Sequence, residues 1–367
     1  MPDFAVAAGV MRHFEIDGEL VSVEAYGSGH INDTSCAAFQ RREGLARFIL
    51  QRINTHIFPN PEPLMENIQR VTTHLAALMA NEPGADRRVL TLVSTWDGRS
   101  LYRDREDGCW RVYKFIEGAR TYNTAANAER AFESAKAFGH FQKMLVNLPG
   151  PRLHDILPGF HNTPRRYEAF ERVIAEDPVG RVASARAEIE FAVARKSVAN
   201  VLVDADLPER VTHNDTKLNN VLFDDATGEG ICVIDLDTTM PGLALYDFGD
   251  MVRTATSPVD EDERDLARVE MQFPMFEALM RGYLSSAGSF LTDAEKRHLA
   301  VAGKLITFEQ GIRFLTDHLA GDTYYKVSRP NQNLDRCRTQ FRLIGSIEKQ
   351  EEAMEMLIAR LLDELAG

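Results

Sequence analysis

The chain has 367 residues, of which 44% are hydrophobic and 26% are charged, and its formal net charge is −13. This composition is typical of a folded globular protein and excludes a disordered or fibrous chain. The negative charge argues against a nucleic-acid partner, because binding to a phosphate backbone relies on a broad positive field. A chain of this length usually forms two lobes or domains, since a single core stops growing below this size.

Cysteine usage and hydropathy indicate where the protein works. The cysteines are widely scattered and form no C-x-x-C pair, which is typical of reduced thiols in a cytoplasm. The N-terminal stretch lacks the pattern of a signal peptide, and no later segment has the apolar length of a membrane span. We therefore expect a cytoplasmic protein without a membrane partner, acting as a monomer or a weak homodimer.

The first third of the chain predicts a small β-rich lobe. Short runs of β-prone residues bounded by turn signals predict an antiparallel meander, and a helix that begins with proline residues follows it. Two more strands come after the helix. The expected strands are residues 20–27, 33–40, 46–54, 88–95 and 109–117, and the expected helix is 61–80.

Beyond this lobe the pattern changes to helices. Residues 128–145 and 185–202 have helical periodicity, as does most of the C-terminal part, and only a hairpin at 221–235 interrupts them. We therefore predict an α+β fold with two lobes. Residues 1–116 form a small antiparallel sheet with one helix, and residues 117–367 form a larger, mainly helical lobe. A cleft between two such lobes is a favoured small-molecule site.

The segment "THNDTKLNNVLF", residues 212–223, places polar side chains directly before the hairpin. His213, Asp215 and Asn220 satisfy the pattern H-x-D-x-x-x-x-N, in which the Asp accepts a proton from a substrate hydroxyl and the Asn binds Mg²⁺ at the nucleotide phosphates. Lys217 lies between them and is placed to reach the transferring phosphoryl group. Ordinary turn formation is the alternative explanation for each polar residue taken alone.

A second carboxylate is needed for the metal, and three candidates follow. Asp247 begins the letters "DFG", yet it lies 32 residues past Asp215 and follows "MPGLALY" and not a strand of the hairpin. Asp235 ends the second strand of the hairpin, which should return beside the first strand and bring this carboxylate close to Asn220. We therefore expect Asp235 to be a metal ligand, Asp237 to be a second ligand or a support, and Asp247 to brace the loop.

The segments "YGSGHINDT", "HNDTKLNN" and "IDLDTTMPGLALYDFGD" resemble the aminoglycoside phosphotransferase and choline kinase superfamily, and within it the N-acetylhexosamine 1-kinases. The resemblance extends from about residue 26 to 313. It implies a bilobal protein-kinase-like fold and an enzyme that uses ATP and Mg²⁺. The reaction that it implies is phosphorylation of the anomeric hydroxyl of N-acetylglucosamine or N-acetylgalactosamine, so the expected partners are ATP and a small sugar.

The resemblance also assigns residues to the nucleotide and the sugar. Gly27 and Gly29 lie where kinases cover the nucleotide phosphates, although such a pair can also form a plain hairpin turn. By the same resemblance His30 and Asp33 become candidate partners of sugar hydroxyls, which require hydrogen-bond donors and acceptors. Phe115 and Ile116, in the segment that joins the lobes, are the expected apolar contacts of adenine. Gln310 and Arg313, three residues apart on a predicted helix, are the remaining sugar candidates.

The third strand departs from the protein-kinase pattern because it has no V-A-I-K lysine. It reads "FILQRIN", so Gln51 or Arg52 must take that position, and alternation allows only one of them into the cleft. We expect Arg52 because of its charge. Its helical partner would be Glu62 or Glu66, between which the sequence does not decide, and a single helical Glu is more often a solvated charge.

Other functions are weighed against the sugar kinase. The acceptor could be an aminoglycoside, an amino alcohol or another sugar position, and a pseudokinase that only binds nucleotide is a further alternative. Intact Asp215, Asn220 and Asp235 argue against the pseudokinase. Nothing similar to the A-P-E segment follows Asp247, which argues against a protein kinase.

The segment containing His154, Asp155 and His161 lacks metal-ligand spacing and is expected to be a loop near the cleft.

Overall fold

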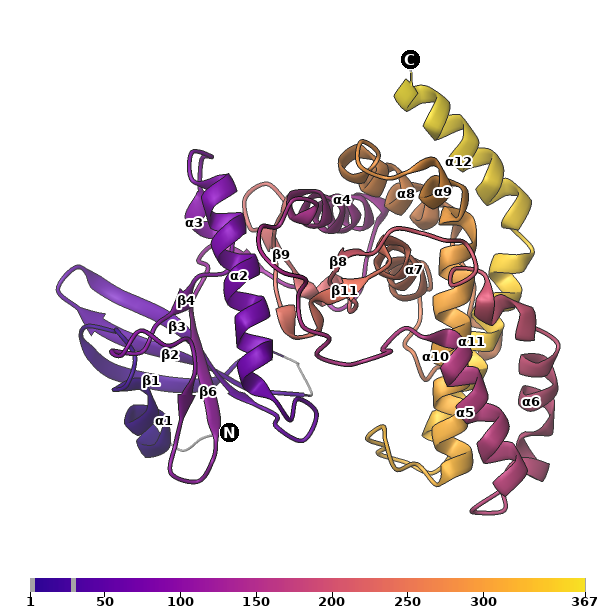
Figure 1. Ribbon diagram of the computed structural model, residues 1–367, viewed down its shortest axis with the longest axis horizontal. Helices are drawn as coiled ribbons and strands as arrows, with labels where there is room; N and C mark the ends of the chain where they lie inside the picture. The colour runs from indigo at the N-terminus through magenta and orange to yellow at the C-terminus, as the bar shows by residue number, and fades with distance from the viewer. Residues whose placement is uncertain (1–3, 28–30, 367) are drawn as a thin grey trace.

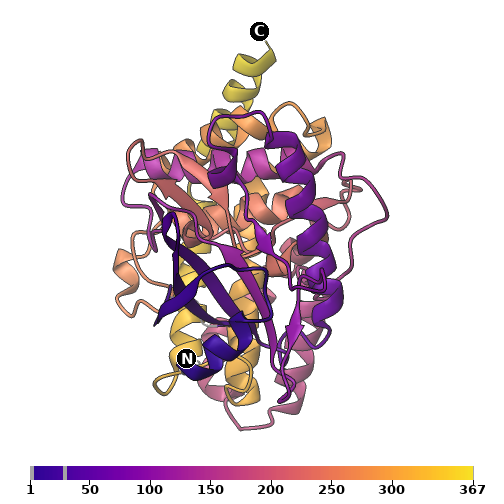
Figure 2. The same cartoon turned by 90° about the vertical axis from the view of Figure 1, so that its left-hand side faces the viewer.

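The computed structural model describes residues 4–27 and 31–366 of the chain (Figure 1). It has a small lobe built on an antiparallel sheet and a larger helical part, as predicted from the sequence. Figure 2 shows the indigo sheet in front of the helical lobe. None of the helices in the described residues is long and apolar enough to cross a membrane. The exact boundary between the lobes, expected at residue 116, stays a prediction.

The sheet of the small lobe has the order β1-β2-β3-β6-β4, with β5 also paired to β6. The elements of the small lobe are α1 (Phe4–Met11), β1 (Glu19–Ala25), β2 (Asp33–Arg41), β3 (Gly44–Ile53), α2 (Pro61–Met79), α3 (Ala85–Arg88), β4 (Leu92–Val93), β5 (Tyr102–Arg103) and β6 (Cys109–Lys114).

The two faces of this sheet have different neighbours because side chains alternate along each strand. Phe48 and Leu50 of β3 pack with Trp110 of β6 in one buried cluster, together with apolar residues of α1. The opposite face contributes Tyr113 of β6 to a second cluster, which contains the apolar stripe of α2. Residues of α4 and Leu236 also belong to this second cluster, so it joins the two lobes.

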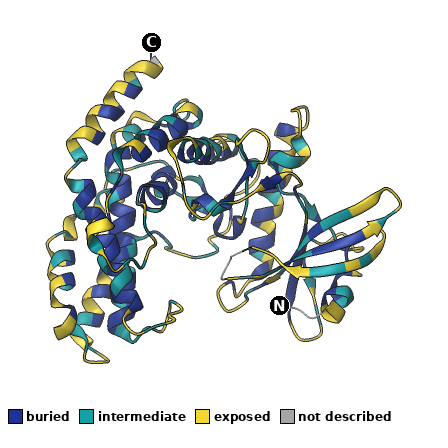
Figure 3. Cartoon of the chain, turned by 180° about the vertical axis from the view of Figure 1, so that it is seen from behind, coloured by how far each residue is buried: buried dark blue, intermediate teal, exposed yellow. Residues whose placement is uncertain are grey.

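The helical lobe packs around one large buried cluster (Figure 3). Its helices are α4 (Ala128–Leu145), α5 (Thr163–Glu176), α6 (Arg186–Val193), α7 (Ala244–Ala255), α8 (Phe273–Ala287), α9 (Asp293–Arg297), α10 (Leu299–Ala320), α11 (Gln332–Glu348) and α12 (Glu351–Ala366). Its strands are β7 (Ala119–Arg120), β8 (Arg210–Thr212), β9 (Val221–Asp224), β10 (Gly230–Val233) and β11 (Met240–Gly242).

Several expected elements need correction. The strand expected at 88–95 is reduced to the two residues of β4, because the chain still belongs to α3 at Arg88. The helix expected at 185–202 ends at Val193 and is followed by a short 3-10 helix at Lys196–Asn200. The hairpin at 221–235 is confirmed, but it does not interrupt the helices alone, since β7 pairs with β9 and β8 pairs with β11.

Candidate active site

A cavity of about 500 Å³ is lined by both lobes. Its apolar lining comes from the sheet, from the segment that joins the lobes and from the catalytic hairpin, and includes Ile49, Phe115, Ile116 and Leu222. Its charged and amide lining comes from residues 215–220 and 235–238, and also from the small lobe, which contributes Asn32, Gln51 and Arg111. One cavity therefore offers an apolar wall suited to an aromatic ring and a charged wall suited to phosphates.

The polar wall is formed by a loop between two short sheets. β8 ends at Thr212, and a 3-10 turn at Leu218–Asn220 leads directly into β9. His213 is buried and fixes this loop to the hairpin, because its Nε2 lies 2.9 Å from the carbonyl oxygen of Ile234. Its Nδ1 accepts a hydrogen bond from the backbone N–H of Asp215. The loop therefore has one fixed path beside the second strand of the hairpin.

Asp247 supports the same loop from below. It lies on α7 and is fully buried. Its carboxylate accepts hydrogen bonds from the backbone N–H groups of His213 (2.9 Å) and Asn214 (2.7 Å), and from Gln142 Nε2 on α4 (2.7 Å). These contacts are the brace that we expected of Asp247. The letters "DFG" here belong to a helix and not to a metal-binding loop.

Asp215, Lys217 and Asn220 meet at the mouth of the cavity. Lys217 Nζ lies 2.8 Å from Asp215 Oδ1, and Asn220 Nδ2 donates to the backbone oxygen of Asp215 at 2.8 Å. Burial by itself would raise the pKa of Asp215, but the charge of Lys217 outweighs it and the pKa lies below its ordinary value. The carboxylate of Asp215 is therefore ionised at neutral pH, as a proton acceptor must be.

Asp235 is the carboxylate of this site that lacks a partner. It lines the cavity with an exposed side chain and makes no hydrogen bond or ion pair within residues 4–27 and 31–366. Its backbone adopts the left-handed conformation, with φ 58° and ψ 62°, which is costly for a residue with a side chain and is often found at functional sites. Although the side chain is accessible from the cavity, the protein atoms around it reduce its hydration, and this desolvation together with the nearby carboxylates of Asp237 and Asp215 raises the pKa of Asp235 to about 6.

These residues fit a divalent cation. The backbone N–H of Ile234 donates to the carbonyl of Asn220 at 2.9 Å, so the hairpin returns Asp235 beside Asn220 as expected. Asn220 uses its amide nitrogen on Asp215, which leaves its Oδ1 as an acceptor. Mg²⁺ prefers oxygen ligands and is commonly held by one or two carboxylates together with substrate phosphates. Asp235 and Asn220 offer that ligand set.

Asp237 is engaged by the small lobe. It forms a buried ion pair with Arg111 Nη1 on β6, and Asn32 Nδ2 donates to its other oxygen at 2.6 Å. Both of its oxygens are therefore engaged by the small lobe, which favours the role of a support over that of a second metal ligand. Arg111 was not among the residues expected at the site, although a charged residue between the apolar neighbours of a central strand signals a buried partner.

The expected nucleotide residues are distributed unevenly. Gly27, Phe115 and Ile116 line the cavity, whereas Gly29 lies outside the described residues. The expectation for Arg52 is wrong. Gln51 lines the cavity, and the guanidinium of Arg52 lies 5.6 Å from the ring centroid of Trp110 on the other face of the sheet.

Neither glutamate of α2 points into the cleft as a partner for β3; both have other partners. Glu62 pairs with Arg103 at 2.6 Å, and Glu66 Oε2 lies 2.8 Å from His154 Nε2. Both glutamates are exposed. The arrangement of a strand lysine paired with a helix glutamate, used by protein kinases, has no counterpart at these positions.

The expected acceptor residues lie in three different places. His30 is outside the described residues. Asp33 is exposed and pairs in register with Arg52, so it lies on the face of β2 that points away from the cavity, while its neighbours Asn32 and Thr34 line the cavity. Gln310 and Arg313 lie on α10 and contact each other at 3.1 Å, and neither lines this cavity.

A buried network connects α10 with the catalytic loop. Glu309, next to Gln310, accepts from Thr163 Oγ1 at 2.7 Å and lies 2.8 Å from His161 Nδ1. The other ring nitrogen of His161 lies 3.2 Å from the carbonyl of Asn214. His161 was expected in a mere loop near the cleft. No sequence pattern around His161 indicated this contact, because its partner lies more than fifty positions away in the chain.

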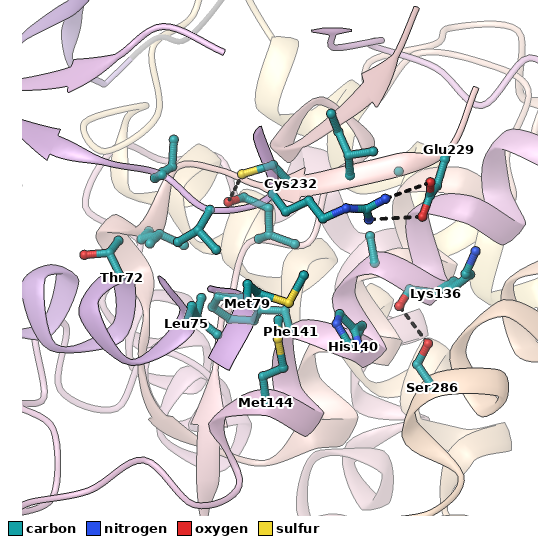
Figure 4. A pocket seen from close by; sticks show the side chains of 18 residues that line it. Thr72, Leu75, Met79, Lys136, His140, Phe141, Met144, Glu229, Cys232 and Ser286 are labelled. Carbon is teal, nitrogen blue, oxygen red and sulfur yellow. Dashed lines mark hydrogen bonds and ion pairs between the residues drawn. The ribbon is translucent and has the colours of Figure 1, made fainter. Parts of the chain in front are cut away.

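A second, smaller cavity of about 190 Å³ lies behind the hairpin (Figure 4). Its apolar lining includes Leu75, Met79, Phe141 and Met144 from α2 and α4, and Cys232 from β10. Leu236, the residue after Asp235, also lines it. The segment that carries Asp235 therefore lies between two cavities.

The fold and this site define a bilobal phosphotransferase of the kinase-like type. Residues 22–278 match the model of the phosphotransferase enzyme family, and the chain belongs to that family. The match begins within β1 and includes the rest of the sheet, the catalytic loop and the hairpin.

Solved structures share this fold. The chain is similar to an aminoglycoside phosphotransferase from Alicyclobacillus acidocaldarius, with a TM-score of 0.60, 13% identity, and 97% of this chain and 96% of that chain covered. A choline kinase from Cryptosporidium parvum matches with a TM-score of 0.53, 15% identity and complete coverage of both chains, 100% and 100%. A spectinomycin phosphotransferase in complex with ADP and spectinomycin matches with a TM-score of 0.55, 13% identity, and 94% and 97% coverage.

Proposed function

We propose that this phosphotransferase is an ATP- and Mg²⁺-dependent kinase that phosphorylates the anomeric hydroxyl of an N-acetylhexosamine. The observation that carries the kinase part is the convergence of Asp215, Asn220 and the unpartnered Asp235 on one cavity with an apolar wall. Family membership supports the reaction class. The sugar rests on the resemblance of three sequence segments and on the charge of the cavity.

Asp215 is the proposed base. Its ionised carboxylate accepts the proton of the acceptor hydroxyl while that oxygen attacks the γ-phosphorus in line with the leaving ADP. Lys217 is held beside Asp215 by their ion pair, and its side chain is 46% exposed, so it is free to contact the transferred phosphoryl group. The left-handed backbone of Asn214 (φ 64°) turns the loop directly before Asp215.

Asn220 and Asp235 are the proposed ligands of Mg²⁺, and Asp237 supports them. The ion, when bound, neutralises charge on the nucleotide phosphates. The hairpin contributes rigidity, because hydrogen bonds of its two strands fix the separation of the two ligands. Phe115 and Ile116 supply the apolar wall proposed for adenine, together with Tyr26, whose ring lies 5.4 Å from that of Phe115.

The charge of the cavity supports a neutral acceptor. Asp215 is paired with Lys217 and Asp237 with Arg111, so among the lining carboxylates only Asp235 lacks a cationic partner within the described part of the chain. A polycationic aminoglycoside would require a cluster of free acids. A neutral sugar needs hydrogen-bonding groups instead, which are available on this wall.

Arg313 is the proposed sugar contact on the helical lobe. Its guanidinium lies 5.2 Å from the ring of Phe160, the neighbour of His161, and 5.8 Å from the ring of Tyr325. Arg166, which the sequence analysis did not select, donates to the carbonyl of Phe160 at 3.1 Å. Arginine and aromatic side chains together supply the donors and flat surfaces that bind sugar rings.

One experiment tests the activity and the acceptor together. The protein is incubated with Mg·ATP and a panel of N-acetylhexosamines, other sugars, choline, ethanolamine and aminoglycosides, and the product is located by phosphorus NMR. We expect an anomeric phosphate on N-acetylglucosamine or N-acetylgalactosamine. Arg313→Ala should raise KM for the sugar about tenfold and leave KM for ATP nearly unchanged, while the exposed Arg297→Ala serves as the control. Preferred phosphorylation of choline or an aminoglycoside, or a 6-phosphate product, would contradict the sugar assignment and leave the kinase assignment intact.

A further inference from the structure

The metal-binding segment is tied to the small lobe by a polar network of Asn32, Gln51, Arg111 and Asp237, called the Arg111 network below. Arg111 Nε donates to Gln51 Oε1 at 2.9 Å, and its Nη1 is paired with Asp237. Gln51 in turn donates to Thr34 Oγ1 at 3.0 Å. The network therefore connects the start of β2, the strands β3 and β6, and the 3-10 turn that follows Asp235.

Arg111 is held in one position by its surroundings. Its side chain is 1% exposed and that of Asp237 is 5% exposed, so the pair is shielded from water. A planar guanidinium with two fixed partners has little freedom to rotate. Burial by itself would lower the pKa of Arg111, but the negative charge of Asp237 outweighs this effect and keeps the pKa of Arg111 above its ordinary value. The pair is therefore a rigid connection between the lobes.

Apart from the Arg111 network, the metal-binding segment has polar contacts with the catalytic loop and borders a cavity. His213 Nε2 lies 2.9 Å from the carbonyl oxygen of Ile234, and Thr238 Oγ1 donates to the carbonyl oxygen of His213 at 2.7 Å. Leu236 and Cys232 line the 190 Å³ cavity of Figure 4, whose nearby wall is formed by apolar side chains of α2 and α4. Apolar contacts are not directional, so they limit the position of a loop less strictly than a fork of hydrogen bonds does. The left-handed backbone of Asp235 adds strain that the surroundings must counter.

We propose that Arg111 is a positioning residue that holds the ligand Asp235 in place through Asp237, and that this link replaces the strand lysine and helix glutamate pair of protein kinases. This inference rests on the proposed function. The exposed positions of Glu62 and Glu66 support it, because α2 supplies no carboxylate to the cleft. Asn32, directly before β2, donates to the same carboxylate, so this group connects residues of the small lobe with the metal-binding segment.

The test separates positioning from fold stability. Removing Arg111 alone leaves a buried, unpaired Asp237, which destabilises a protein strongly, whereas replacing both partners by apolar residues of similar volume is often neutral. We therefore compare Arg111→Met/Asp237→Leu with the wild type, and use Arg103→Met/Glu62→Leu as the matched control, because that ion pair is exposed. The dissociation constant of ADP is measured by calorimetry with MgCl₂ and with EDTA, and unfolding is followed by circular dichroism.

We expect Mg²⁺ to tighten ADP binding at least tenfold in the wild type and in the control. In the Arg111→Met/Asp237→Leu protein we expect that gain to fall below threefold, while ADP binding in EDTA stays within threefold of wild type and the unfolding transition is retained. If this variant does not fold, Asp237→Asn, which keeps an oxygen for Arg111 but loses the charge, is measured instead with the same expectation.

Two results would overturn the proposal. A full Mg²⁺-dependent gain in the folded variant would show that the pair serves stability alone. Equal weakening of ADP binding with and without Mg²⁺ would show that Arg111 does not act through the metal-binding segment. Failure of the wild type to bind ADP under any condition would instead contradict the proposed function, from which this inference follows.

Discussion

Asp215, the proposed base, lies 2.8 Å from the ammonium group of Lys217 and in contact with Asn220. Asp215→Asn retains the shape and the hydrogen bonds of the loop but removes the basic group. We expect kcat to fall by roughly a hundredfold or more, while the dissociation constant of ADP changes less than about threefold. Asp225→Asn, at an exposed site in the following hairpin turn, is the control. Turnover near the wild-type rate in folded Asp215→Asn protein would exclude this role.

We expect substitution of Asp247 to lower stability and substitution of Asp235 to lower activity. Asp247→Ala leaves two buried backbone N–H groups without an acceptor, so we expect the free energy of unfolding to fall by about 3 kcal/mol. Asp235→Ala removes a carboxylate that has no partner and stands near two other acids, so stability should be kept while Mg²⁺-dependent turnover is lost.

Urea unfolding and a Mg²⁺ titration of turnover measure these two effects. The assignment would be reversed if Asp247→Ala were stable but inactive and Asp235→Ala were active. At this scale the sequence pattern located both acids correctly relative to the hairpin. It failed at Arg52, because β3 has apolar side chains on both faces and the pattern does not indicate which face meets the cleft.

The helix that carries Asp247 owes its position to close packing against α10. A Cβ atom added at Gly249 would lie 2.4 Å from the backbone oxygen of Ala302 and 2.7 Å from Ile306 Cγ1. Since backbone cannot yield as a flexible side chain does, Gly249→Ala should force α7 and α10 apart.

We expect Gly249→Ala to lower the free energy of unfolding by about 1 to 3 kcal/mol and to reduce kcat as well, because α7 braces the catalytic loop. Gly345→Ala is the matched control. Gly345 is also helical and has open space around an added Cβ atom. Alanine there should leave the free energy of unfolding unchanged or increase it by up to about 1 kcal/mol. Equal effects in urea unfolding would contradict the packing argument.

The turn of the catalytic hairpin is stabilised by Asp224. Its Oδ1 accepts from the backbone N–H groups of Ala226 and Thr227 at 2.9 Å, and Arg87 pairs with its other oxygen at 2.8 Å. These groups lower the pKa of Asp224 to about 2. Because the folded pKa lies below the unfolded value of about 3.9, the stabilisation is complete above that value and is lost as pH falls toward 2.

The difference in unfolding temperature between wild type and Asp224→Ala should therefore be largest between pH 5 and 7 and should shrink as pH is lowered below 4. Differential scanning calorimetry at several pH values measures it. A difference that does not change with pH would show that the carboxylate charge is unimportant for the turn.

The two lobes share a buried cluster in which α2 packs with α4 and Leu236, and they share the cavity that contains the candidate site. A nucleotide bound there contacts both lobes in the folded state only. We therefore expect ADP with MgCl₂ at a hundredfold excess over its dissociation constant to raise the unfolding temperature by about 3 °C. Asp215→Asn should show the same shift, since it keeps the binding site. No shift in either protein would contradict nucleotide binding in this cavity.

The order of the segments along the chain was enough to predict a sheet lobe followed by a helical lobe, and the hairpin with Asp215, Asn220 and Asp235. These features depend on local periodicity, on turn residues and on a motif whose members lie within about twenty positions, so the sequence contains them directly. Only the tertiary structure decided that Asp33 and Arg52 face away from the cavity and that Arg111, Asn32 and His161 support the site. Their partners are distant in sequence, and the direction of a side chain on a strand with two buried faces is set by what packs against each face.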